Sequence, residues 1–136
     1  MPDTQEINEF LLTVGSTFTW HEVNVPDVNK AIEFYTSVLG WTTKSMDMGP
    51  MGTYTMFCKG EVAMCGIMAT VGEMAEVPPH WSTYINVDDV DSSVAKAEAA
   101  GGSCRVPAFD IPTVGRIALI CDNQGAHFWL FKPEPN

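Results

Sequence analysis

The residue whose type and setting best suit chemistry is Glu22, which stands two positions from Trp20 in a short segment of alternating polarity. The alternation places both side chains on one face of a strand and His21 on the other, toward a helix. A carboxylate beside aromatic rings can serve as a general acid or base, or as a hydrogen-bond anchor for a ligand. We therefore predict Glu22 as the catalytic candidate; a solvated carboxylate, or one paired with Arg105 or Arg116, is the open alternative.

Aromatic side chains form the second group of candidates. Tyr84, Trp129 and Phe131 fall at alternate positions of two other strand-like segments. Alternate positions share one face of a strand, so these rings and Trp20 are expected to line one cleft. Aromatic walls with few polar groups suit a planar or apolar small molecule, and filling of the cleft by the rings themselves is the alternative.

An internal repeat provides the elements that would position these residues. Asn-Val-Pro-Asp-Val at residues 24–28 recurs as Asn-Val-Asp-Asp-Val at residues 86–90, about half the chain later. Asp27 and Asp89 are each a plausible N-cap for a following amphipathic helix, and Gly40 is a stop signal for the first one. The repeat therefore predicts two equivalent modules.

Each module reads β-α-β-β-β, because three strand-like segments follow each helix. A single module leaves one sheet face uncovered, so we expect an α+β fold in which two paired modules form a curved mixed sheet around a cleft, with the helices outside. The whole chain, residues 1–136, is expected to be one domain, with modules at about 17–70 and 80–132 and a connector at 71–79. The expected strands are 18–25, 42–47, 53–58, 62–69, 82–87, 103–107, 116–121 and 126–132.

Composition excludes several classes of protein. The formal net charge of −10 disfavours nucleic acid and anionic membranes as partners. No apolar run is long enough to span a bilayer, and no basic segment precedes the apolar patch at residues 10–14, so we expect a soluble, cytoplasmic protein. The four cysteines lack a Cys-x-x-Cys pair and are expected to be reduced.

Two motifs add a resemblance to a known family. The string Ala-Ile-Glu-Phe-Tyr-Thr-Ser-Val-Leu-Gly-Trp at residues 31–41 and Asp-Asn-Gln-Gly-Ala at residues 122–126, set in this repeat, resemble the vicinal oxygen chelate superfamily. That group includes glyoxalase I, extradiol dioxygenases and bleomycin resistance proteins. Residues 20–23, 80–81 and 114–116 are similar to its subgroup labelled glyoxalase-like or hydroxylase.

The resemblance implies where a divalent metal would bind. Enzymes of the superfamily use His and Glu on the first and last strands of each module, and three of those positions fall on Trp20, Ser82 and Trp129 here. The fourth lies within residues 62–68, which contain no carboxylate. We therefore predict no metal and no other cofactor, with a displaced site of Glu22, His80 and His127 as the alternative.

Together these expectations predict metal-independent binding of a small apolar or aromatic molecule in the cleft, as the resistance-type members do. The alternatives are a glyoxalase- or dioxygenase-like enzyme, either metal-free with Glu22 as acid or base or metal-dependent, and a regulatory module that acts through a protein surface. The resemblance also implies a homodimer. The predicted ligand-binding residues are Trp20, Glu22, Ser82, Tyr84, His127, Trp129 and Phe131.

Overall fold

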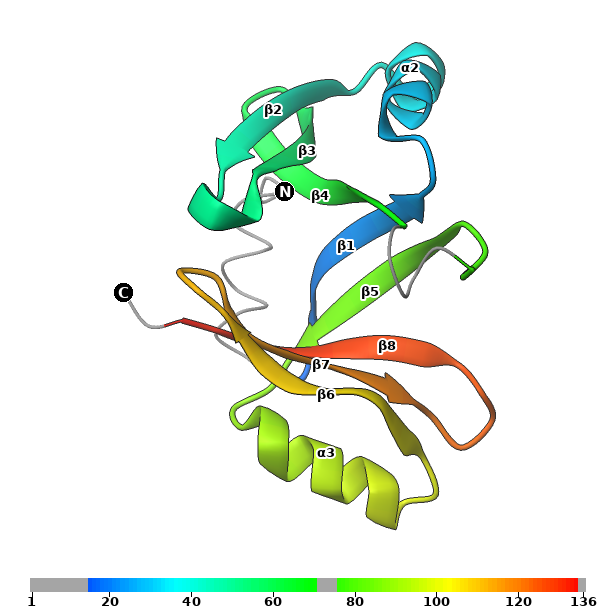
Figure 1. Ribbon diagram of the computed structural model, residues 1–136, viewed down its shortest axis with the longest axis vertical. Helices are drawn as coiled ribbons and strands as arrows, with labels where there is room; N and C mark the ends of the chain where they lie inside the picture. Colours follow the sequence, from blue (N-terminus) through cyan, green and yellow to red (C-terminus); the bar gives the residue numbers. More distant parts are fainter. Residues whose placement is uncertain (1–14, 71–75, 135–136) are drawn as a thin grey trace, which may run out of the picture. The chain divides into compact units, whose positions relative to one another are not determined.

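The computed structural model describes residues 15–70 and 76–134 (Figure 1). They divide into a first unit, Trp20–Ser82, and a second unit that runs from Thr83 onward and includes the residues up to Thr19. The elements are β1 (Phe18–Val25), α2 (Val28–Leu39), β2 (Thr42–Asp47), the 3-10 turn η1 (Gly49–Met51), β3 (Thr53–Lys59), β4 (Val62–Ala69), β5 (His80–Asn86), α3 (Val90–Ala99), β6 (Ser103–Ile111), β7 (Gly115–Cys121) and β8 (His127–Pro133).

The two units repeat one strand order. In the first unit the order is β2-β3-β4-β1, with β1 and β4 parallel and the other pairs antiparallel. The second unit has the equivalent order β6-β7-β8-β5, with β5 and β8 parallel. The predicted α+β class and the two β-α-β-β-β modules are therefore confirmed, and each mixed sheet follows from its module's single crossover helix.

Side-chain caps fix where both helices begin. Asp27 Oδ1 accepts a hydrogen bond from the Lys30 backbone N–H at 3.0 Å, and Asp89 Oδ1 accepts one from Ser92 at the same distance. Gly40 ends α2 in the left-handed conformation, with φ of 69°, which glycine adopts without strain. The predicted caps and stop are therefore confirmed.

Replacing the first cap tests its contribution to stability. Asp27→Ala removes the acceptor for an N-terminal N–H of α2, so the free energy of unfolding is expected to fall by about 1 kcal/mol. Urea unfolding followed by tryptophan fluorescence measures the change. Asn29→Ala, an exposed change in the first turn of the same helix, is the control. Equal losses in the two variants would show that the cap contributes nothing of its own.

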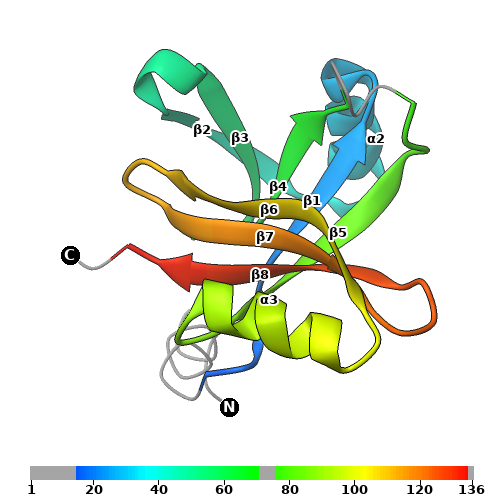
Figure 2. The ribbon, with the colours of Figure 1, turned by 60° about the horizontal axis from the view of Figure 1, so that its bottom comes forward.

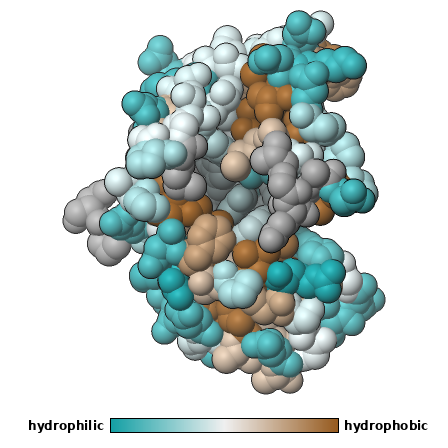
Figure 3. Space-filling view, viewed as in Figure 1, coloured by the Kyte–Doolittle hydropathy of each residue, from teal (hydrophilic) through white to brown (hydrophobic). Residues whose placement is uncertain are grey.

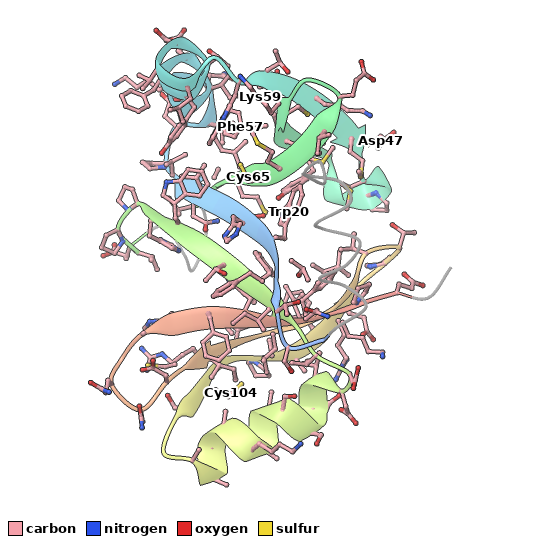
Figure 4. The ribbon with its side chains drawn as sticks, turned by 180° about the vertical axis from the view of Figure 1, so that it is seen from behind. Trp20, Asp47, Phe57, Lys59, Cys65 and Cys104 are labelled. Carbon is pink, nitrogen blue, oxygen red and sulfur yellow. The ribbon has the colours of Figure 1, made fainter. Side chains whose placement is uncertain are left out.

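Each helix packs on one face of its own sheet. In the first unit, α2 covers a cluster built on Val23, Phe57, Cys65 and Ile67, and Figure 4 shows Phe57 and Cys65 on that side of the sheet. In the second unit, α3 lies across its sheet (Figure 2), and its Val90 forms a buried cluster with Ala118, Ile120 and Leu130. The alternate strand positions therefore face away from each unit's helix.

Strand β6 is longer than the sequence predicts. The expected strand ends at Pro107 because proline normally stops strands, but β6 continues to Ile111. Because β6 is the edge strand of the second unit, the missing N–H at Pro107 removes no essential ladder bond. Register shifts on either side of Val106 also mark irregular pairing there.

The family-type motif at residues 122–126 is a turn between β7 and β8. Asp122 Oδ1 accepts hydrogen bonds from the backbone N–H groups of Gln124 at 2.8 Å and Ala126 at 3.0 Å. These bonds lower the pKa of the Asp122 carboxyl. The motif therefore has a structural role, which is to stabilise the turn of the β7–β8 hairpin.

Two other predictions concern segments that lie wholly or partly outside the described residues. The apolar patch at residues 10–14 and residues 71–75 of the predicted connector lie outside the described residues. Residues 76–79, the rest of that connector, contain no helix or strand. No helix in the described part of the chain is long and apolar enough to cross a membrane.

Burial makes one thiol unreactive. Desolvation, with a smaller contribution from Cys58, raises the pKa of Cys65 to about 11. Since the ordinary value is 9.0, the thiolate population near pH 8 falls by about 100-fold, and we expect Cys65 to be alkylated at least that much more slowly in the folded protein than in urea. Peptide mass analysis of iodoacetamide-treated protein measures this. Equal rates in the folded and unfolded states would contradict the burial.

Candidate functional site

A hydrogen-bond network on the first unit centres on Glu22. The Tyr54 hydroxyl donates to Glu22 Oε2 at 2.7 Å, and the Asn24 amide donates to Glu22 Oε1 at 3.0 Å. The indole N–H of Trp20 donates to the Tyr54 hydroxyl at 3.1 Å. Only 6% of Glu22 is exposed, so these bonds replace water around a buried carboxylate.

The network extends to a second predicted residue through Asn24. The Ser82 hydroxyl donates to Asn24 Oδ1 at 2.7 Å, while the same amide group donates to Glu22. The structure therefore brings together Trp20, Glu22 and Ser82, as predicted, on the sheet face opposite α2. Figure 4 shows Trp20 on this part of β1.

Gly66 gives Tyr54 room to reach Glu22. Strand β4 lies between β3 and β1, and Gly66 pairs with Met56 on one side and Glu22 on the other. A Cβ atom on Gly66 would overlap the phenol of Tyr54. The Tyr54 ring therefore crosses β4 at Gly66, which has no side chain, whereas its paired neighbours Met56 and Glu22 do.

The second unit carries the predicted aromatic group. Tyr84 and Trp129 are paired across β5 and β8, and their rings stack with centroids 5.7 Å apart and planes 10° apart. Phe131 meets Tyr84 edge to face at 6.4 Å. These three residues lie together as predicted, on the sheet face opposite α3, whereas Phe128 and Leu130 pack toward the helix. This geometry fits stacking of planar groups.

Not every candidate joins these clusters. His127 and His21 are both exposed. All three guanidinium nitrogens of Arg116 are bonded to Asp91, at 2.9 and 3.0 Å, and to Asp110, at 3.1 Å. This hydrogen bonding lowers the pKa of Asp91, and a pairing of Glu22 with Arg105 or Arg116 stays a prediction.

The family's metal chemistry does not fit the residues present. The indole groups of Trp20 and Trp129 cannot act as ligands, and the Ser82 hydroxyl is directed to Asn24. Among residues 15–70 and 76–134, no three His, Cys, Asp or Glu side chains gather closely enough to hold a metal ion. We therefore derive no step through a metal, and its absence stays a prediction.

The first hollow on the described surface does not coincide with the polar network around Glu22. A hollow of about 330 Å³ lies in the second unit beside the β6–β7 turn, and its lining includes Asp110, Arg116 and Lys132 but none of the predicted site residues. It is open, and its arginine is already paired with two carboxylates. Hydrophobic side chains also reach the surface of each unit (Figure 3). We place the candidate site at Glu22 because its polar contacts converge there.

The chain belongs to the Glyoxalase/Bleomycin resistance protein/Dioxygenase superfamily, whose family model matches residues 17–130. This match confirms the resemblance stated from the sequence. The protein "Putative glyoxylase CFP32" of Mycobacterium tuberculosis is 37% identical over 131 residues, which cover 96% of this chain and 49% of the relative. "Anthracycline biosynthesis protein DnrV" of Streptomyces peucetius is 27% identical over 129 residues, covering 83% and 46%.

The chain thus spans about half the length of the curated relatives it matches. Among solved structures, methylmalonyl-CoA epimerase from Mycobacterium tuberculosis is similar with a TM-score of 0.61 and 20% identity, covering 89% of this chain and 90% of the epimerase. At that identity the likeness shows a shared fold.

Proposed function

We propose that this protein binds a small aromatic molecule without a metal, on the face of the first unit that carries Trp20, Tyr54 and Glu22. The observation that carries the proposal is the buried carboxylate at which the hydrogen bonds converge, bordered by an indole and a phenol. Such a surface supplies both an apolar wall and a polar anchor, which are the two components of a small-molecule site. Tyr84, Trp129 and Phe131 offer a second stacking surface for the same class of ligand.

Calorimetric titration with neutral bicyclic aromatics, 2-naphthol and tryptophol, tests the proposal. We expect saturable binding that is unchanged after treatment with EDTA. Trp20→Ala removes one aromatic wall and should weaken binding roughly 3–10-fold, since an aromatic contact contributes about 0.5–1.5 kcal/mol.

Trp81→Ala is the matched control for this prediction. Trp81 also belongs to the first unit, and its indole also donates to a tyrosine hydroxyl, that of Tyr35, at 3.2 Å. The Trp81→Ala variant should bind the probes with the same affinity as the unaltered protein. Equal losses in the two tryptophan variants, or binding that EDTA abolishes and a divalent metal restores, would overturn the proposal.

An enzyme that uses Glu22 for proton transfer is the second candidate. The 2.7 Å bond from Tyr54 favours it, because a phenol and a carboxylate in contact can pass a proton to or from a substrate. The name of the mycobacterial relative suggests an assay of glyoxalase turnover. Turnover that Glu22→Gln abolishes, with ligand affinity retained, would favour this candidate over simple binding. A homodimer and a cytoplasmic location stay predictions.

A further inference from the structure

The aromatic face of the second unit is the side of its sheet that carries Tyr84, Trp129 and Phe131. Helix α3, the described helix of this unit, packs on the opposite side around Val90 and Leu130. The three rings are each half-buried. A sheet buries an apolar face by packing a second layer on it, so the aromatic face can accept a further element.

The first described residues are fixed at this face. Asn86 has its side chain there, because it alternates with Tyr84 along β5 and pairs with Phe131. Asn86 Oδ1 accepts hydrogen bonds from the backbone N–H of Thr17 at 3.0 Å and from the Thr17 hydroxyl at 2.9 Å. The Ser16 N–H donates to the Asn86 carbonyl at 2.7 Å. The preceding segment therefore joins the fold at a point beside Phe131.

The sequence of that preceding segment has the pattern of an amphipathic helix. Residues 1–14 lie outside the described residues, and we infer their role from the sequence. Asp3, with Glu6 three positions later, is a typical start signal for a helix. Apolar residues then recur at spacings of three and four and form an N-terminal stripe: Ile7, Phe10, Leu11 and Val14.

Gly15 provides the matching stop. Its φ of 79° is in the left-handed region, where glycine commonly ends a helix, as Gly40 ends α2 with a φ of 69°. A helix over residues 4–14 is about 16 Å long. Phe131 and Trp129 are two positions apart on β8, which corresponds to about 7 Å. A helix that starts beside Phe131 is therefore long enough to cover both rings.

We propose that residues 7–14 dock on the aromatic face of their own chain, with the N-terminal stripe against the rings. Two observations carry the proposal: Thr17 and Asn86 tie the first described residues to this face, and an apolar stripe with a helix stop directly precedes them. Burial of apolar surface drives the docking. The chain itself then occupies the aromatic face, and a planar ligand that stacks there must displace the segment.

Digestion of the full chain with a glutamate-specific protease measures the docking, because Glu9 lies within the segment. The bond after Glu9 should be cleaved at least about 10-fold more slowly than in a synthetic peptide of residues 1–14, since cleavage follows the released fraction. Trp129→Ala removes one ring and should raise the rate about 3–10-fold. Trp81→Ala, which removes an exposed indole from the first unit, should leave the rate unchanged.

Two adjacent leucines test the stripe. Leu11→Ser removes an apolar side chain from the stripe and should raise the rate by about 10-fold or more. Leu12→Ser removes the same side chain from another side of the predicted helix and should not. Each rate is divided by that of a synthetic peptide with the same substitution, which removes any effect on the protease. Cleavage after Glu98, in α3 of the same unit, should stay slow in every variant and shows that the unit remains folded.

Three results would overturn the proposal. The first is cleavage of the unaltered protein at the rate of the peptide, and the second is equal release by the two leucine variants. The third is protection that dilution removes, because it would place the segment on a second copy of the chain. Trp20-dependent binding of 2-naphthol is measured separately on the first unit, so the proposed function can hold or fail independently of this inference.

Discussion

Gly66→Ala is expected to lower both the stability of the first unit and its affinity for an aromatic ligand. The new methyl group would occupy space that the phenol of Tyr54 fills, and forced overpacking of this kind costs about 1–3 kcal/mol. Tyr54 must then leave its position, which breaks its hydrogen bonds to Glu22 and Trp20. A buried carboxylate that loses a donor adds about 1–3 kcal/mol more. Urea unfolding measures the loss, and titration with tryptophol measures the affinity.

A double-mutant cycle separates the clash from any other effect of the new side chain. In a Tyr54→Ala background the ring that would collide is absent, so Gly66→Ala should change stability by less than about 0.5 kcal/mol. Alanine is otherwise acceptable there, since Gly66 does not have the positive φ that requires glycine. An equal cost in both backgrounds would mean that the space above Gly66 is not reserved for Tyr54.

Local sequence patterns were sufficient to locate one side of the site. Strict alternation along β1 places Trp20, Glu22 and Asn24 on the face opposite Val23, and the observed contacts follow that division. The same logic correctly groups Tyr84 with Trp129 and Phe131. Alternation works because a side chain's face within one strand depends on local backbone geometry.

Tyr54 was missed because its role depends on pairing between strands. Counting back from the Lys59–Val62 pair next to the turn, a regular hairpin would place Gly66 opposite Thr55, on the other face from Tyr54. The register shifts between Phe57 and Cys58, so Gly66 instead pairs with Met56 and shares the face of Tyr54. A one-residue irregularity therefore decides which side chains meet, and the strand pattern contains no signal for it.

Gly66 illustrates a related difficulty. It lies within residues 62–68, the segment where the resemblance implies a metal ligand and where the sequence has no carboxylate. In the structure the missing side chain lets a phenol donate to the carboxylate on the neighbouring strand. The donor Tyr54 thus comes from β3, a strand that does not contain any of the family's ligand positions.

Phe57→Ala is expected to give a large loss of stability, about 3–5 kcal/mol, because it empties the centre of the first unit's core. The side chain is fully buried and contacts two rings, with its centroid 5.5 Å from that of Tyr35 in α2 and 5.4 Å from that of Trp41. Urea unfolding followed by tryptophan fluorescence should show a lower midpoint, and the nearby Trp41 should report the change directly.

Phe34→Ala is the control that separates burial from aromatic content. Phe34 also contacts Tyr35, edge to face at 5.2 Å, but is 58% exposed. Removing this side chain leaves no enclosed cavity, so the free energy of unfolding should fall by less than about 1 kcal/mol. Similar losses in the two variants would place the stabilising contacts on the outer surface of α2. The expected difference instead assigns the stabilising contacts to the side of α2 that faces the sheet. That packing supports β3 and β4 on the face opposite Tyr54 and Gly66, and thereby keeps these two residues in register.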